Sequence, residues 1–220
     1  QITARLNLRL QAASEEEARK LAEAYLQEQQ VVNGDTLRLT WQVAEQIAGS
    51  VAFEILVPHR LLVALDLVSK NGSISVQNVP VAGEVMTKNG SVTIEGTAYG
   101  DLEVETKNGS ITIAADVGTL TATSKNGSVR CAVEPVRNGN INLAANNGSV
   151  QAELVCRDDI GYKLEAQTRS GRVTADLPSL VLATREKNHL NGATDNWEQA
   201  RIKTQVTALS KNGSITLSSR

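Results

Sequence analysis

Apolar and polar residues alternate in short segments on both sides of a turn that recurs along most of the chain. Counting from the glycine of each turn, positions +2 and +4 are apolar and position +3 is polar or charged. The apolar pairs are Ile74 and Val76, Val92 and Ile94, Ile111 and Ile113, Val129 and Cys131, Val150 and Ala152, Val173 and Ala175, and Ile215 and Leu217. A period of two residues predicts β-strands with one buried face.

A second strand is predicted before each turn, because small or apolar residues again occupy alternate positions there. These pairs are Leu65 and Leu67, Gly83 and Val85, Leu102 and Val104, Leu120 and Ala122, Ile141 and Leu143, Leu164 and Ala166, and Val206 and Ala208. A looser set of glycines marks the opposite edge, at Gly83, Gly100, Gly118, Gly139 and Gly161. Each repeat therefore holds two half-buried strands joined by two turns.

The turn itself is Lys-Asn-Gly-Ser at residues 70–73, 88–91, 107–110, 125–128 and 211–214, with diverged copies at 146–149 and 169–172. Consecutive copies up to residue 172 are 18 to 23 residues apart, a period typical of repeat architectures. An antiparallel meander that closes into a barrel and a parallel solenoid both fit this alternation. We favour an all-β solenoid, a two-sided parallel β-helix or β-roll of about six to seven coils of 18–23 residues, because its facing strands form their own core and stack like residues on like.

In a stacked coil the Asn and Gly of the turn have structural roles. Glycine accepts a positive φ, asparagine tolerates one, and stacked Asn amides bond to the coils above and below. The predicted turn ladder consists of Asn71, Gly72, Asn89, Gly90, Asn108, Gly109, Asn126, Gly127, Asn147, Gly148, Asn212 and Gly213.

Residues 1–60 have a different pattern. An alternating segment at residues 2–10 predicts a strand, Ser14 and Glu17 form a capping box before an amphipathic helix, and further alternating segments follow residue 35. We expect an amino-terminal strand-helix-strand cap over 1–60 and solenoid repeats over 61–220. An insertion at about residues 178–204 interrupts them, and its His189 and Trp197 could line a small site, although Trp197 as a plug for the last coil is favoured.

Composition and charge exclude several classes of function. The net charge is −2 and aromatic residues are 3%, so we expect no nucleic-acid partner. No apolar run is long enough for a transmembrane segment. Cys131 and Cys156 lack metal-ligand spacing and are expected to act as small apolar residues.

The repeated Asn-Gly-Ser-Ile/Val, the opposite-edge glycines and Val57-Pro58 resemble the bacterial putative-adhesin domains, over roughly residues 36–220. This resemblance implies a β-solenoid of parallel strands, found in some surface or membrane-associated bacterial proteins, and it brings no catalytic residues. We therefore expect a non-catalytic structural or interaction module, a cell-envelope-associated or adhesin-like scaffold at the bacterial surface or membrane.

Two alternatives from other classes are a carbohydrate-active β-helix enzyme and a self-assembling scaffold. An enzyme needs paired acids on an outer face, but the +3 column is Ser75, Thr93, Thr112, Arg130, Gln151 and Thr174. We expect no enzymatic activity, no cofactor and no metal, since Lys stands where calcium-binding β-rolls carry Asp. Self-association is expected, if at all, through the carboxyl-terminal coil ending at Arg220.

The lysines of the turn are the candidate recognition feature. Lys70, Lys88, Lys107, Lys125 and, in a weaker coil, Arg169 would form a row that binds a polyanion. The partner could be an anionic envelope polymer, a lipid surface or another protein. The simpler interpretation is a solubilising edge that discourages aggregation.

Overall fold

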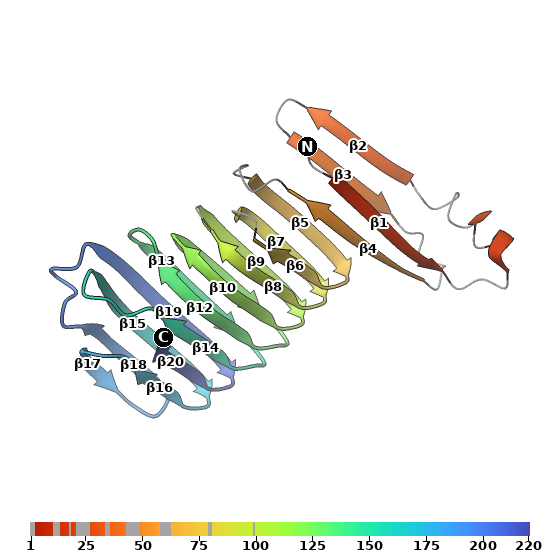
Figure 1. Ribbon diagram of the computed structural model, residues 1–220. Coiled ribbons are helices and arrows are strands. Elements are labelled where there is room, and N and C mark those ends of the chain that lie inside the picture. Colours follow the sequence, from red (N-terminus) through yellow and green to blue (C-terminus); the bar gives the residue numbers. More distant parts are fainter. Residues whose placement is uncertain are drawn as a thin grey trace. The chain divides into compact units, whose positions relative to one another are not determined.

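The computed structural model describes residues 3–10, 14–17, 19–20, 27–33, 36–42, 49–57, 63–78, 81–98 and 100–220. The chain divides into two compact units, Gln1–Pro58 and His59–Arg220. Figure 1 shows the strands of both units.

The first unit contains two antiparallel strand pairs. Strand β1 (Thr3–Leu10) pairs with β4 (Gly49–Leu56), and β2 (Gln27–Asn33) pairs with β3 (Thr36–Gln42). Residues 15–17 and 19–20 are helical, and the Glu17 N–H donates to Ser14 Oγ at 3.2 Å. The predicted capping box therefore begins the helical segment, which lies between β1 and β2 in the sequence.

The second unit consists of two sheets. The nine-stranded sheet has the order β17-β18-β15-β19-β13-β11-β9-β7-β5 and the seven-stranded sheet has the order β16-β20-β14-β12-β10-β8-β6. The strands of the nine-stranded sheet are β5 (Val63–Asn71), β7 (Val81–Asn89), β9 (Asp101–Asn108), β11 (Thr119–Ser124), β13 (Gly139–Ala145), β15 (Ile160–Ser170), β17 (Leu180–Arg185), β18 (His189–Thr194) and β19 (Ile202–Asn212). Those of the seven-stranded sheet are β6 (Ile74–Gln77), β8 (Val92–Thr97), β10 (Ile111–Val117), β12 (Val129–Pro135), β14 (Val150–Leu154), β16 (Val173–Asp176) and β20 (Ile215–Ser219).

Strands from neighbouring coils pair in parallel and in register with the repeat. Ile74 pairs with Val92, Val92 with Ile111, and Ile111 with Val129. The parallel solenoid is therefore confirmed and the barrel alternative is wrong. The inner faces of the two sheets form the core, in which Ile111, Leu120 and Ile141 are fully buried.

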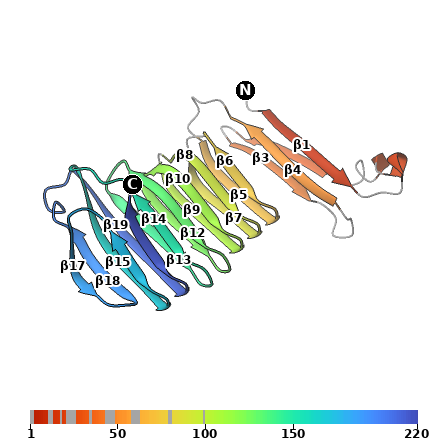
Figure 2. The same ribbon diagram turned by 60° about the horizontal axis from the view of Figure 1, so that its bottom comes forward.

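The order of the coils in space differs from their order in the sequence. Strand β19 lies between β13 and β15 (Figure 2), and β20 lies between β14 and β16 in the other sheet. The coil β15–β16, which comes earlier in the sequence, therefore leaves one strand position in each sheet between itself and the coil β13–β14. The later coil β19–β20 occupies that position. The carboxyl-terminal coil is covered on both sides, so the expectation of self-association through that coil is wrong.

The segment expected as an insertion at residues 178–204 extends the nine-stranded sheet. Strands β17 and β18 form an antiparallel hairpin, and β18 pairs antiparallel with β15. A turn at Thr194–Ala200 then leads into β19. The alternation of Leu180 and Leu182 is the sequence signal for β17. The residues around it are polar and contain no Lys-Asn-Gly-Ser motif, so the strand is hard to recognise in the sequence.

Candidate functional site

The asparagines of the turn form one continuous hydrogen-bonded ladder. Each Asn donates its Nδ2 to the Oδ1 of the Asn in the coil before it in space. The pairs are Asn89 to Asn71 and Asn108 to Asn89 at 2.7 Å, and Asn126 to Asn108, Asn147 to Asn126 and Asn212 to Asn147 at 2.8 Å. The ladder passes from Asn147 directly to Asn212, because β13 and β19 are neighbours in space although they are far apart in the sequence.

The turn glycines are required for close stacking. A Cβ on Gly109 would lie 2.0 Å from the Gly90 carbonyl oxygen, far inside van der Waals contact. The same close approach occurs at Gly90, Gly127, Gly148, Gly171 and Gly213. Among the described residues, the glycines with a positive φ are instead Gly83 and Gly96. The expectation that the turn needs glycine for its φ is therefore wrong.

A column of buried hydroxyls supports the turn from inside, and sequence reasoning missed it. Thr106 Oγ1 donates to the Gly90 carbonyl at 2.9 Å, and Ser124 Oγ donates to the Gly109 carbonyl at 2.8 Å. The equivalent donors in other coils are Thr87, Thr168 and Ser210. The available signal was a Ser or Thr two residues before the Asn position in every coil except that of Ala145.

The cations of the turn follow one another along the outer face of the nine-stranded sheet, in a set that we call the basic row. Its spatial order is Lys70, Lys88, Lys107, Lys125, Lys211 and Arg169, all exposed, and the uncharged Asn146 takes the place of a cation between Lys125 and Lys211. Neighbouring strands are about 4.8 Å apart. Sequence reasoning left out Lys211, because the chain order hid its place between Asn146 and Arg169.

Carboxylates balance the first part of the basic row. Asp66, Glu84 and Glu103 lie side by side on adjacent strands, and Asp101 and Glu105 flank Glu103 on β9. In the following coils the same outer face carries Thr119, Thr121 and Thr123 on β11, Asn140, Asn142 and Ala144 on β13, Gln205, Thr207 and Leu209 on β19, and one pair of opposite charges, Lys163 and Glu165, on β15. The positive potential is therefore strongest toward the end formed by Lys125, Lys211 and Arg169.

That end of the basic row borders a surface hollow of about 500 Å³. Its polar lining includes Asn146, Gln167, Arg169, Asn188 and Lys211. Among the described residues, no side-chain hydrogen bond or ion pair involves the Lys211 ammonium or the Arg169 guanidinium. We call this group the basic hollow; its two cations are free to bind an anion.

The two residues expected as a small site in the insertion are not brought together. His189 Nε2 lies 2.6 Å from Glu165 Oε1 at the first residue of β18, whereas Trp197 follows the other end of that strand. The Trp197 ring lies 5.8 Å from Lys203 Nζ, and its Cα packs above Gly161. Trp197 therefore fills the bend before β19.

Metal ligands, thiols and membrane-spanning helices are the remaining features of the described residues that bear on chemistry. The described residues contain no cluster of three or more His, Cys, Asp or Glu side chains that could hold a metal ion. Both cysteines are free, and burial raises the pKa of the Cys131 thiol to about 12, so this thiol stays protonated at neutral pH. None of the described helical segments is long and apolar enough to cross a membrane.

Residues 49–218 match the sequence profile of the Toastrack DUF4097 family. The chain belongs to this family. The resemblance to putative-adhesin domains expected from the Asn-Gly-Ser repeats is thereby confirmed, and the Toastrack match includes β4 and the solenoid up to β20. No curated protein matches the chain.

One solved structure is similar to this Toastrack chain. It is the crystal structure of a "putative cell adhesion protein from Clostridium sporogenes", with 14% sequence identity and a TM-score of 0.29, covering 88% of this chain and 76% of that one.

Proposed function

We propose that this Toastrack chain is a non-catalytic, adhesin-like interaction module of the bacterial cell envelope, and that it binds a phosphate-bearing polyanion at the basic hollow. The observation that carries the proposal is the pair of cations Lys211 and Arg169, which have no ion-pair partner among the described residues and lie beside a hollow with no carboxylate in its lining.

The geometry of the basic row suits a linear ligand. A polymer that lies along it meets Lys125, then the amide of Asn146, then Lys211 and Arg169, at steps of about 4.8 Å. Exposed cations of this kind attract polyanions through a long-range field that salt screens over about 10 Å. The ligand therefore gains affinity from several weak contacts, and the affinity falls as salt rises.

The carboxylates of the outer face support a binding role more than a catalytic one. Asp66, Glu84 and Glu103 lie on an exposed sheet face and line neither the basic hollow nor the larger cavity at the end of the solenoid. A glycosidase needs its two acids on opposite sides of a bound sugar. These three side chains instead lie in a row on the outer face of the strands that carry Lys70, Lys88 and Lys107.

Binding of inorganic polyphosphate and of vesicles that contain an anionic phospholipid tests the proposal. The double variant Lys211→Gln/Arg169→Gln should bind polyphosphate at least tenfold more weakly at about 50 mM salt, because it removes both cations of the hollow. The matched control is Lys88→Gln/Lys107→Gln, which removes the same charge from the acid-flanked part of the row and should have a smaller effect.

The two probes distinguish a soluble polymer from a lipid surface as the source of phosphate. Equal binding by the wild type and the Lys211→Gln/Arg169→Gln variant would overturn the proposal. A variant that binds normally but aggregates would support the simpler role of the basic row, which is to keep the turn edge soluble.

A further inference from the structure

The two sheets of the solenoid end at different layers. Seven coils contribute one strand to each sheet, and the hairpin β17–β18 adds two strands to the nine-stranded sheet alone. Strand β16 is therefore the last strand of the seven-stranded sheet. Across the core from β18 and β17, two strand positions beyond β16 are filled by none of the described residues.

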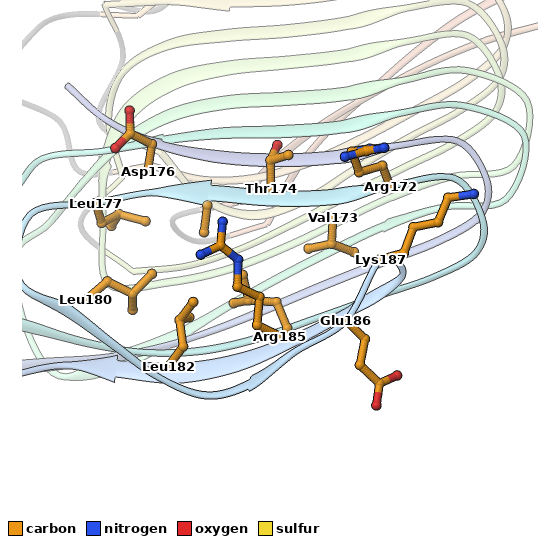
Figure 3. Close-up of a pocket in the computed structure, with 12 residues that line it drawn as sticks. Arg172, Val173, Thr174, Asp176, Leu177, Leu180, Leu182, Arg185, Glu186 and Lys187 are labelled. Carbon is orange, nitrogen blue, oxygen red and sulfur yellow. The ribbon is translucent and has the colours of Figure 1, made fainter.

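The hairpin turns an apolar face toward these two positions. A cavity of about 590 Å³ lies there, and its apolar lining includes Val173, Leu177, Leu180, Leu182 and Leu190. Figure 3 shows Leu177, Leu180 and Leu182 reaching into the gap between β16 and β17. Leu180 and Leu182 are only half-buried, whereas the equivalent leucines and isoleucines of inner coils are fully buried. The core is thus open at this end.

The free edge of β16 supplies backbone groups to the same cavity. Arg172 faces β20, since its carbonyl accepts from the Ile215 N–H at 2.9 Å. The backbone N–H and C=O groups of successive residues point alternately to the two edges of a parallel strand, so those of Val173 and Ala175 point to the open edge. The Val173 N–H already donates to the Lys187 carbonyl at 2.9 Å, whereas the Ala175 N–H and carbonyl face the cavity.

The charges around the cavity favour an acidic occupant. Arg172, Arg185 and Lys187 line it, together with Asp176 and Glu186. Figure 3 shows Arg185 extending from β17 across the gap and Glu186 pointing away from it. A guanidinium over an apolar floor is best satisfied by a carboxylate, which it can bind through two hydrogen bonds.

We propose that this cavity is a strand-binding slot, which takes an extended, acidic segment of a partner protein as an added strand beside β16. The backbone of the segment bonds to Ala175, alternate apolar side chains cover Leu180 and Leu182, and a carboxylate pairs with Arg185. Addition of a strand to an exposed sheet edge is a common mode of peptide recognition, in which main-chain bonds give affinity and alternate pockets give specificity.

A second copy of the chain fits this end poorly. The first coil would have to pair β6 with β16 while its β5 met β17, but β17 stands two strand positions beyond β16. The strands β5 and β6 of the first coil lie in one layer, so they cannot pair with β17 and β16 at the same time. The unequal sheets therefore favour a single extended segment over end-to-end stacking.

Selection of binders from a phage-displayed heptapeptide library tests the slot with the full chain as bait. Enriched peptides should alternate apolar and acidic residues, and a synthetic copy of the best one should slow amide exchange at Ala175. The variant Ala175→Pro removes the edge N–H without breaking the β16–β20 ladder, because edge strands tolerate proline. It should bind the peptide at least tenfold more weakly.

The matched control is Ser75→Pro, which places proline on the open edge of β6 at the other end of the same sheet and should leave binding unchanged. If Ala175→Pro does not fold, Arg185→Glu serves instead and should also weaken binding at least tenfold. Equal binding by these variants, the absence of enriched peptides, or sedimentation that shows a dimer covering the slot would overturn the proposal.

Discussion

At the residue scale, the turn glycines show that the space between coils decides their identity. A Cβ added to Gly109 would lie 2.0 Å from the Gly90 carbonyl oxygen, whereas at Gly72 the nearest atom to an added Cβ is Ser69 Oγ at 3.3 Å. The difference arises because the coil of Gly72 is the first in the stack, and the described residues place no earlier turn against it.

This contrast predicts that the same substitution lowers stability strongly at one copy of the motif and only slightly at another. Gly109→Ala should lower the free energy of unfolding by about 2 kcal/mol or more, because the added methyl forces two coils apart. Gly72→Ala should change it by less than about 0.5 kcal/mol. Urea unfolding of the two variants measures the difference, and similar losses for both would contradict it.

At the element scale, the asparagine ladder has a direction. Each inner Asn donates to the coil before it and accepts from the coil after it, whereas Asn71, as the first member, accepts from Asn89 through Oδ1. The two roles distinguish inner members from the first member, although their local sequences are the same.

The direction predicts how Asp is tolerated along the ladder. Asn108→Asp removes the donor to Asn89 and places two oxygens in contact, so unfolding should become easier by about 1–3 kcal/mol. Asn71→Asp keeps the acceptor and should cost much less. Thermal unfolding at pH 7 compares the two, and an equal loss of stability would show that the ladder has no preferred direction.

The sequence was sufficient for the repeat, the two strands per coil and the parallel stacking, because Asn71, Asn89 and their equivalents recur at one phase. It was not sufficient for the coil order, since local alternation carries no information about which coil neighbours which. The missed signal was whether a copy of the motif keeps the asparagine of the ladder. The intact copy around Asn212 lies inside the stack, where the ladder needs it, and the diverged copy around Ser170 lies in the last motif-bearing coil.

At the scale of the whole molecule, the coil order can be tested by crosslinking. Gln151 pairs directly with Thr216, and Thr216 pairs with Thr174 on its other side. Gln151 and Thr174 are therefore two strand spacings apart, about 9.6 Å, which exceeds the reach of a disulfide.

The pair Gln151→Cys/Thr216→Cys should form a disulfide under mild oxidation, and Gln151→Cys/Thr174→Cys should not, both in a Cys156→Ser background. Mass spectrometry of digested samples identifies the crosslink. The reverse result would place the coils in the order of the sequence.

The interior position of the coil β19–β20 also bears on how the molecule would carry a mechanical load. A force applied at Arg220 pulls on a coil that is clamped by β13 and β14 on one side and by β15 and β16 on the other. The coil cannot peel from an open end, as a terminal repeat does. Its strand pairings on both sides must break at once. A tether attached there would therefore resist a force that unfolds an ordinary solenoid one coil at a time.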